Sequence, residues 1–243
     1  MIIVIANQKG GVAKTTTVLN LGAGLSREFN TLLIDLDSQT DLTISLGLPN
    51  QERTINDVMQ GKDITKSIYK LDNLSVIPAD KDLKAIQLSL NKSDILFKAL
   101  VPTKEKYDYI LIDTNPGMTI LTINALLASD LILIPVTPEY LALSGLKDFK
   151  KTIEQLKGKF DIDPLVKILI TNFDKRKKLH REAVELIREY FKDDLLKTII
   201  RTNVALAESV SFFKTIYEYK ANSHGSQDYD NLTKEVIKIK GIK

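Results

Sequence analysis

The sequence predicts a single-domain α/β fold: a doubly wound, mostly parallel β-sheet with helices on both faces. Short apolar runs rich in β-branched residues alternate with longer stretches in which apolar residues recur at helical spacing. The 243 residues, 44% hydrophobic and 27% charged, are enough for one domain with a sizeable core. Because no internal repeat or convincing linker divides the chain, we expect one domain over residues 1–243.

The expected strands are short and apolar, as strands buried on both faces of a parallel sheet are. They cover residues 1–6, 31–37, 74–78, 107–113, 130–135, 165–171 and 195–200. Segments long enough for a helix separate most of them, and such crossovers join parallel strands. The carboxyl ends of these strands should therefore meet at one edge of the sheet.

The expected helices follow from apolar periodicity and from capping residues at their ends. They cover residues 16–28, 42–46, 54–59, one or two helices within 81–101, 118–128, 140–157, 179–191 and 228–239. The segment at 54–59 begins with a capping threonine and stops before Gly61, and the segment at 81–101 is expected to break near residues 91–93. These helices supply the two layers that cover the sheet.

A glycine-containing loop at residues 9–16 stands between the first expected strand and the first expected helix. Strand, glycine turn and helix form the context of a phosphate-binding loop, because backbone N–H groups and a helix N-terminus converge on one anion. Lys14 is expected to pair with the β- and γ-phosphates and the Thr15 hydroxyl to ligate Mg²⁺. The predicted nucleotide-binding residues of the loop are Gly10, Gly11, Val12, Ala13, Lys14, Thr15 and Thr16.

The loop departs from the ordinary phosphate-loop pattern, which has glycine where this chain has Gln8 and Ala13. It has a second lysine instead, Lys9, at its front. The segment resembles the deviant Walker A motif, Lys-Gly-Gly-x-x-Lys-Thr, of the ParA/MinD ATPase superfamily. The resemblance implies that Lys9 reaches across a dimer interface to the nucleotide of the partner subunit.

Carboxylates end the expected strands that neighbour this loop. Asp113 ends an apolar strand and fits the Walker B role of holding Mg²⁺, although such a residue can also be a solvated strand end. The segment from Asp35 through Asp37 to Gln39 resembles the Asp-x-Asp-x-Gln segment of the family. By that resemblance Asp37 positions the attacking water and Asp35 supports the metal site.

Further segments extend the resemblance over almost the whole chain and favour the small ParA, or Soj-like, branch. Residues 135–146 are similar to the Pro-x-x-x-Glu-Tyr-x-Ala-x-x-Gly-Leu run of ParA proteins, and residues 203–209 to their Asn-Val-x-Leu-x-Glu-Ala segment. Asn172 follows a strand, as the adenine-contacting segment of the family does, and can also be read as a turn asparagine. The chain departs from the family at Asn115, Gly117 and Ala205.

The resemblance implies an ATP-dependent switch: ATP closes a homodimer, the dimer binds double-stranded DNA without sequence preference, and a ParB-like adaptor stimulates hydrolysis. Non-specific DNA binding is phosphate neutralisation by lysine and arginine. The formal net charge of +3 permits this without demanding it. The expected DNA-binding residues are Lys175, Arg176, Lys177, Lys178, Arg181, Arg201 and Lys214, with His180 and Lys220 as neighbours.

Two other functions are weighed against this one. A MinD-like membrane-cycling ATPase would need a basic amphipathic helix at the C-terminus, and residues 234–243 alternate cations with apolar residues. Leu232, Val236 and Ile239 form one stripe, however, which suits a helix packed on the sheet, so membrane binding is not expected. An ATP-dependent metabolic enzyme of the same superfamily is the other alternative, and no additional acid–base or metal-ligating set supports it.

Composition and the start of the chain limit the remaining classes. The sequence contains no cysteine, which excludes a disulfide framework, a thiolate iron–sulfur cluster and a cysteine zinc site. Met1 leads directly into the first expected strand, and no apolar run approaches the ~20 residues of a membrane span. The expected location is the cytoplasm, and the resemblance to ParA proteins implies association with the nucleoid.

Overall fold

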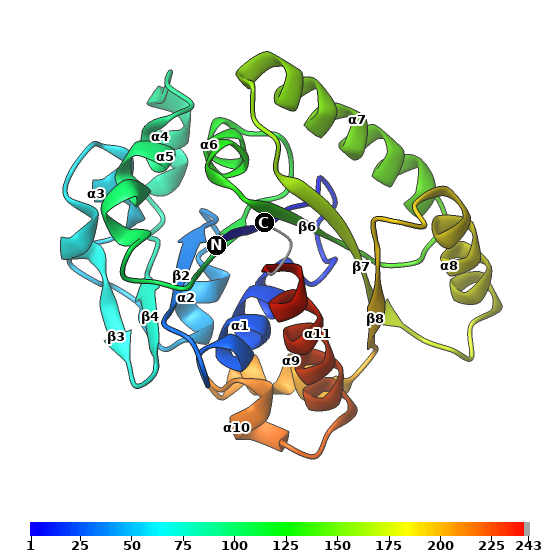
Figure 1. Ribbon diagram of the computed structural model, residues 1–243. Helices are drawn as coiled ribbons and strands as arrows, with labels where there is room; N and C mark the ends of the chain where they lie inside the picture. Colours follow the sequence, from blue (N-terminus) through cyan, green and yellow to red (C-terminus); the bar gives the residue numbers. More distant parts are fainter. Residues whose placement is uncertain (241–243) are drawn as a thin grey trace.

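An eight-stranded β-sheet runs through the computed structural model, which describes residues 1–240 (Figure 1). The strand order is β3-β4-β2-β5-β1-β6-β7-β8. Every neighbouring pair is parallel except β3 and β4, which form an antiparallel edge hairpin. The strands are β1 (Ile2–Ile5), β2 (Thr31–Leu36), β3 (Tyr69–Leu71), β4 (Leu74–Ile77), β5 (Tyr109–Thr114), β6 (Leu131–Val136), β7 (Leu165–Phe173) and β8 (Leu195–Arg201).

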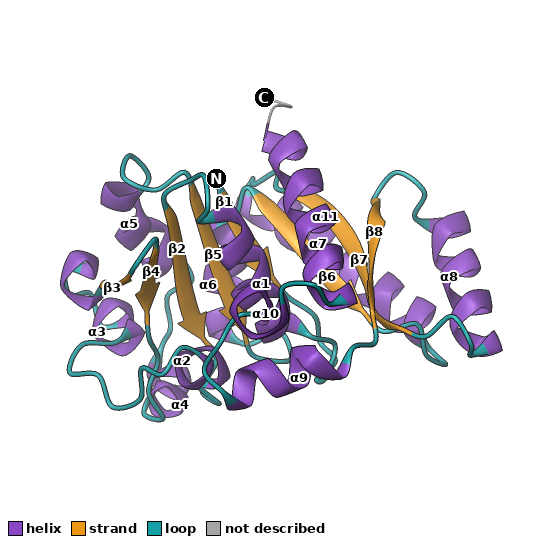
Figure 2. Ribbon diagram, turned by 90° about the horizontal axis from the view of Figure 1, so that it is seen from below, coloured by secondary structure: helices purple, strands orange, loops and turns teal. Residues whose placement is uncertain are grey.

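Helices cover both faces of the sheet and bury a separate apolar cluster on each (Figures 1 and 2). One face carries α1 (Lys14–Leu25), α2 (Asp41–Ser45), α9 (Val204–Ser211), α10 (Ile216–Lys220) and α11 (His224–Lys240). The other carries α3 (Ile55–Met59), α4 (Leu83–Ser89), α5 (Ile95–Leu100), α6 (Ile120–Ala128), α7 (Ala142–Phe160) and α8 (Lys178–Tyr190). Short 3₁₀ helices at η1 (Ile64–Ser67) and η2 (Val101–Thr103) complete the regular structure of residues 1–240.

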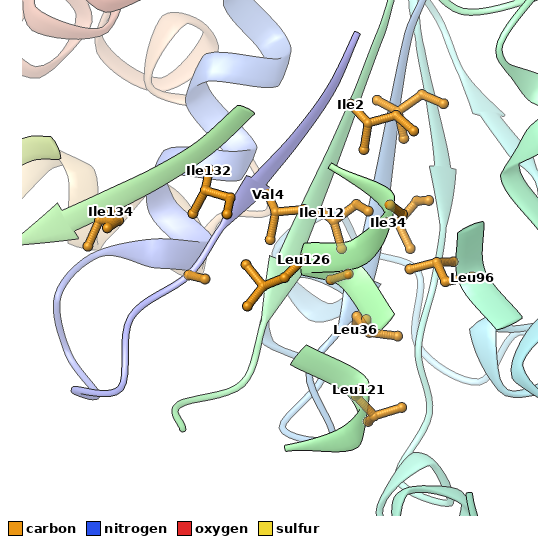
Figure 3. Close-up of a cluster of buried hydrophobic side chains, with 14 of the residues drawn as sticks. Ile2, Val4, Ile34, Leu36, Leu96, Ile112, Leu121, Leu126, Ile132 and Ile134 are labelled. Carbon is orange, nitrogen blue, oxygen red and sulfur yellow. The ribbon is translucent and has the colours of Figure 1, made fainter. Parts of the chain in front are cut away.

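The central strands are buried on both faces, which explains their unbroken apolar sequence. All residues of β1, β2, β5 and β6 are buried. Figure 3 shows Val4, Ile34, Ile112 and Ile132 of these strands in one cluster with Leu126 of α6. Each fully buried aliphatic side chain contributes about 1.5–3 kcal/mol, so this double-sided burial is the main stabilisation of the sheet.

The sequence predicted the larger elements and missed some of the short ones, namely β3, α9 and α10. The break near residues 91–93 is present between α4 and α5, and the capping threonine at 54 forms a capping box with Asp57. Strand β3 has three residues at the edge of the sheet, none of them buried, so burial does not impose the apolar pattern by which strands are recognised. Helix α10 has five residues, and its clearest mark in the sequence is the capping box of Thr215 and Glu218.

The C-terminal helix packs on the sheet, as the stripe of apolar residues predicted. Leu232 and Val236 are fully buried and Ile239 is 9% exposed. These side chains contribute to the same apolar cluster as α1. The last part of the expected tail, residues 241–243, lies outside the described residues.

The register of the parallel strands brings the predicted carboxylates together. Asp113 on β5 lies beside Asp35 on β2 on one side and Ile5 on β1 on the other. The arrows of the parallel strands point to one edge of the sheet, near α2 and α9 (Figure 2). The glycine loop follows β1 at that same edge, which is where open α/β sheets bind their ligands.

The contact between α1 and α11 gives a test of this packing. A Cβ added at Gly24 of α1 would lie 2.3 Å from the Thr233 hydroxyl and 2.9 Å from the Tyr217 hydroxyl. We expect Gly24→Ala to lower the unfolding free energy by about 1–3 kcal/mol, the usual cost of overpacking. The control is Gly158→Ala in α7. An added Cβ there would lie within 4 Å of no atom beyond the adjacent backbone of its own helix, so alanine should stabilise the helix by roughly 0.5–1 kcal/mol. Urea denaturation measures both, and equal effects of the two variants would contradict this packing.

Candidate nucleotide-binding site

The loop between β1 and α1 has the backbone conformation of an anion-binding loop. Gly11 and Ala13 have positive φ angles of 72° and 65°. Ala13 is the N-cap of α1, and its side chain makes no capping hydrogen bond. The N–H groups of the first turn are therefore available to a phosphate, with the positive end of the helix dipole behind them.

A cavity of about 360 Å³ lies over this loop and collects most of the predicted site. Its lining comes from the loop and the start of α1, from the segment between β2 and α2 with the first residue of α2, from the loop after β5 and from the end of β7. The lining residues are Gly11, Ala13, Lys14, Thr15, Thr16, Asp37, Gln39, Asp41, Pro116 and Asn172. The structure thus brings together residues that are far apart in the sequence.

Lys14 is buried at the base of this cavity and faces two acidic side chains. It is only 7% exposed, and its ammonium donates a 3.2 Å hydrogen bond to the backbone carbonyl of Lys9. Burial lowers the pKa of Lys14, and the nearby charges of Asp113 and Asp37 act in the opposite direction. A cation held in this way is placed to meet the negative charge of a phosphate.

Asp113 has the environment of a metal-binding carboxylate. It is fully buried, and neither carboxylate oxygen has a hydrogen-bond partner among the described residues. Burial raises the pKa of Asp113 well above its usual range, and the charge of Asp35 raises it further, while the Thr15 hydroxyl acts in the opposite direction. An orphaned buried carboxylate beside a hydroxyl fits Mg²⁺, which takes one or two protein oxygens and completes its shell with phosphate and water.

Residues 1–240 contain no cluster of three or more histidine, cysteine or acidic side chains arranged as a metal site.

Asp35 is used differently from Asp113. Its carboxylate accepts hydrogen bonds from the N–H of Asp37 and from both the N–H and the hydroxyl of Thr43. The Thr43 hydroxyl in turn accepts the N–H of Ala79. Asp35 therefore fixes the segment after β2 and joins it to β4, and its predicted support of the metal remains a prediction. Burial raises its pKa to about 6.

Asp37 lies at the edge of the cavity that the phosphate would occupy. Its side chain accepts the N–H of Gln39 at 3.0 Å. Burial raises its pKa, and the Gln39 N–H and the charge of Lys14 act in the opposite direction. It is 6% exposed, so one face remains open to the cavity that it lines.

Asn172, the residue predicted to contact the adenine, lies near the end of β7. It has a positive φ of 51°, and its side-chain amide lies 3.4 Å from the Gly11 carbonyl and 3.3 Å from the Thr137 hydroxyl. It lines the cavity over the loop and also a second cavity of about 410 Å³, whose lining includes Lys9, Gly10 and Val12. The structure thus places Asn172 at the loop, and the adenine contact itself stays a prediction.

Lys9 does not point into the cavity of its own loop. Its ammonium forms an ion pair with Glu139 at 2.5 Å, and both side chains are about half exposed. Glu139 follows β6 and lies 130 positions along the chain from Lys9. In the sequence Glu139 stands out only as part of a family segment, without a role of its own.

The predicted DNA-binding residues fall into two groups. Lys175, Arg176 and Lys177 form an exposed turn between β7 and α8, and Lys178, also exposed, is the first residue of α8. Arg176 is paired with Asp174, and Lys178 with Glu182. The described ion pairs include neither Lys175 nor Lys177, and Lys177 also lines the second cavity beside Lys9.

Arg181 and the remaining cations have other surroundings. Arg181 donates to the backbone carbonyl of Lys175 and so closes the turn. Arg201 at the end of β8 binds the buried carboxylate of Asp228 through two of its nitrogens. Lys214 follows α9, whose side chains pack on the face opposite α8. A role in DNA binding stays a prediction for each of them.

Fold and site together define a phosphate-loop nucleotide-binding protein with a doubly wound sheet. The family model AAA_31, described as an AAA domain, matches residues 1–168. The chain is 39% identical to the sporulation initiation inhibitor protein Soj of Bacillus subtilis, over 97% of each chain. It is also 39% identical to the chromosome partitioning protein ParA of Myxococcus xanthus, over 98% of this chain and 88% of that one. The chain therefore belongs to the ParA/Soj family of partition ATPases.

Solved structures share this fold. A putative plasmid partition protein from Borrelia burgdorferi, bound to AMPPNP, is 29% identical and superimposes with a TM-score of 0.85 over 98% of both chains. Cobyrinic acid a,c-diamide synthase from Mycobacterium smegmatis, with bound ADP and magnesium, is 27% identical with a TM-score of 0.84, over 97% of this chain and 93% of that one. Within residues 1–240 we find no helix with the length and apolarity needed to span a membrane.

The orphaned Asp113 carboxylate predicts an unusual dependence of stability on pH. A carboxyl group whose pKa is higher in the folded protein binds more protons there than in the unfolded chain, so stability falls as pH rises between the two values. For Asp35 this interval runs from 3.8 to about 6. For Asp113 it continues to higher pH.

We expect Asp113→Asn to flatten the stability profile of the nucleotide-free protein above pH 6 and to make the fall between pH 3.8 and about 6 shallower, leaving there the part that comes from Asp35 and Asp37. At neutral pH the variant should be more stable by roughly 1–3 kcal/mol, the cost of a buried unsatisfied group. It should also lose the additional stabilisation that Mg²⁺ gives in the presence of ATP. Thermal unfolding from pH 4 to 9 measures both effects, and a variant whose profile matches the wild type would rule out a strained Asp113.

Proposed function

We propose that this partition ATPase works as a switch that is a monomer without ATP and a homodimer with it, and that the dimer binds DNA without sequence preference. Hydrolysis, stimulated by a ParB-like or other adaptor, then releases the DNA and moves a plasmid, a chromosome or another cargo. The protein would act in the cytoplasm, on the nucleoid. Curated relatives named for chromosome partitioning, 36–39% identical over nearly the whole chain, support this proposal.

The surroundings of each residue in or beside the cavity suggest its role. Lys14 stabilises the phosphate charge, and Thr15 and Asp113 hold Mg²⁺ when it is bound with the nucleotide. Asp37 lies at the mouth of the same cavity and orients the attacking water. Asn172 contacts the adenine. The magnesium would supply charge neutralisation for the phosphates.

The orientation of Lys9 carries the dimer proposal. Lys14 lines the cavity over the loop and is buried. The Lys9 side chain, by contrast, is 56% exposed and forms its ion pair with Glu139 outside that cavity. Because the Lys9 side chain lies outside the site of its own subunit, it is available to the nucleotide of a second subunit. Each subunit would then complete the site of the other.

Neither alternative function is favoured by an observation of comparable weight. The apolar residues of the C-terminal stripe are buried against the sheet, so within the described residues they offer no surface to a membrane. The diamide synthase from Mycobacterium smegmatis shares the fold at 27% identity, but no further acid–base set among the described residues that line the cavity supports a metabolic reaction. We therefore propose no second function.

Replacement of Lys9 tests the cross-subunit role. We expect Lys9→Ala to bind a non-hydrolysable ATP analogue within a few-fold of the wild type, because Lys14 and the loop backbone remain. Dimerisation should be lost, and with it stimulated hydrolysis. Sedimentation equilibrium and a nucleotide-binding assay separate the two effects, and a variant that dimerises normally would refute the role of Lys9.

A second test concerns the exposed turn before α8. We expect the ATP-analogue dimer to bind unrelated DNA duplexes alike and the ADP form not to bind. Lys175→Ala should lower the slope of log affinity against log salt by about 0.9 for each DNA phosphate that Lys175 neutralises in the wild type. The control is Lys70→Ala on the edge strand β3, at the opposite end of the sheet, which should change nothing. Equal slopes for wild type and Lys175→Ala would remove this turn from the DNA interface.

A further inference from the structure

All polar groups of Lys9 are engaged within its own subunit. Its backbone N–H donates to the Asn7 side chain at 3.0 Å, and its carbonyl accepts the Lys14 ammonium at 3.2 Å. Its own ammonium binds Glu139 at 2.5 Å. In the nucleotide-free subunit, contacts of both the backbone and the ammonium group of Lys9 thus keep this residue bound within its own subunit.

Asn7 sets the distance between the two partners of the ion pair. Its side-chain N–H donates to the carbonyl of Pro135 at the end of β6, at 2.7 Å, while its side-chain oxygen accepts the N–H of Lys9. One side chain therefore ties the start of the loop to the strand that leads to Glu139.

The backbone around Glu139 is also fixed. Its N–H donates to the carbonyl of Thr137, and its carbonyl accepts the N–H of Ala142 at the start of α7. Leu141, two residues further on, has a left-handed φ of 68°, which costs a leucine about 1–2 kcal/mol and persists only in a well-determined turn. Glu139 is thus presented by an ordered turn.

The charges around Glu139 keep it ionised and give Lys9 a specific partner. Lys9 lowers the pKa of Glu139, first through the hydrogen bond and then through its charge, and His180 and Lys177 add to the effect. Among the described residues that line the second cavity, Glu139 is the carboxylate, and Lys9, Lys177 and His180 share that lining.

We propose that Glu139 is a positioning residue that retains Lys9 in its own subunit and thereby sets the threshold for dimer formation. The inference rests on the proposed function, in which Lys9 completes the site of a second subunit. The side chain of Lys9 cannot serve both partners, so the ion pair breaks in each subunit before the dimer is complete.

The size of the effect follows from the exposure of the pair. An ion pair between half-exposed side chains shifts an equilibrium by roughly 1.5- to 5-fold. A symmetric dimer requires two such pairs to break, so the removal of both carboxylates should favour dimerisation by roughly 2- to 25-fold. This is a threshold that an ATP-driven association can overcome.

The test uses Glu139→Gln, which keeps the shape and removes the charge. The matched control is Glu185→Gln, which removes a carboxylate from another exposed ion pair, that with Arg188 on α8. Sedimentation equilibrium with a non-hydrolysable ATP analogue and Mg²⁺ gives the dimer dissociation constant of each protein. We expect a dissociation constant lowered by roughly 2- to 25-fold for Glu139→Gln and an unchanged value for Glu185→Gln. An unchanged or weaker dimer of Glu139→Gln would overturn the proposal.

A second readout reports the contact in the nucleotide-free monomer. The Lys9 amine attacks an acylating reagent only while it is released from Glu139, so Glu139→Gln should speed the labelling of Lys9 as measured by peptide mass spectrometry. The labelling of Lys70 is the internal control. An unchanged rate at Lys9 would show that Glu139 does not hold it.

Failure of this inference can be told apart from failure of the proposed function. If Lys9→Ala dimerises like the wild type, the cross-subunit role is wrong whatever Glu139 does. If Lys9→Ala fails to dimerise and Glu139→Gln behaves as the wild type, Lys9 acts across the interface and Glu139 does not restrain it.

Discussion

The buried carboxylates Asp35 and Asp113 are the constraint on which the nucleotide site depends. They lie at paired positions of β2 and β5, both fully buried. Two like charges out of water on neighbouring strands are strongly unfavourable unless other groups compensate them. Lys14 supplies one positive charge, and the hydrogen bonds from Thr43 and from the Asp37 N–H satisfy Asp35. Asp113 is compensated less completely, because neither of its oxygens has a hydrogen-bond partner among the described residues, and a metal ion bound there would relieve the remaining cost.

This arrangement links stability to ligand binding. A group that is unfavourable in the nucleotide-free state and favourable with a cation makes the bound state more stable by their difference. The raised pKa of Asp113 has the same cause. A buried carboxylate that lacks a cation binds a proton more readily. The segment after β2 shares this dependence, since Asp35 positions both Asp37 and the start of α2. One buried network therefore connects the metal position to the residue proposed to orient water.

The phosphate loop and the carboxylates of the site could be predicted from the sequence, because the signals for them are local. The strand before the loop, the helix after it and the carboxylates at the ends of apolar strands are each readable within a few residues, and a parallel sheet then brings them together. The pair of Lys9 and Glu139 could not be predicted in this way, since 130 positions separate the two residues and no periodicity relates them. The role of Thr43 was hidden as well, since no local pattern relates it to Asp35, although the two residues are only 8 positions apart. Arg201 looked like a free cation until the structure paired it with Asp228 on α11.

The deviation of the loop from the ordinary motif has a structural explanation at Ala13. The ordinary pattern places glycine there, and the structure shows why: residue 13 has a left-handed φ of 65°. This conformation costs alanine about 1–2 kcal/mol. The surroundings impose it, because the Ala13 carbonyl accepts both the N–H and the hydroxyl of Thr17, and the Val12 carbonyl accepts the Thr171 hydroxyl. A loop held in a strained conformation by its neighbours is already formed before a phosphate arrives, so little ordering entropy is lost when the phosphate binds.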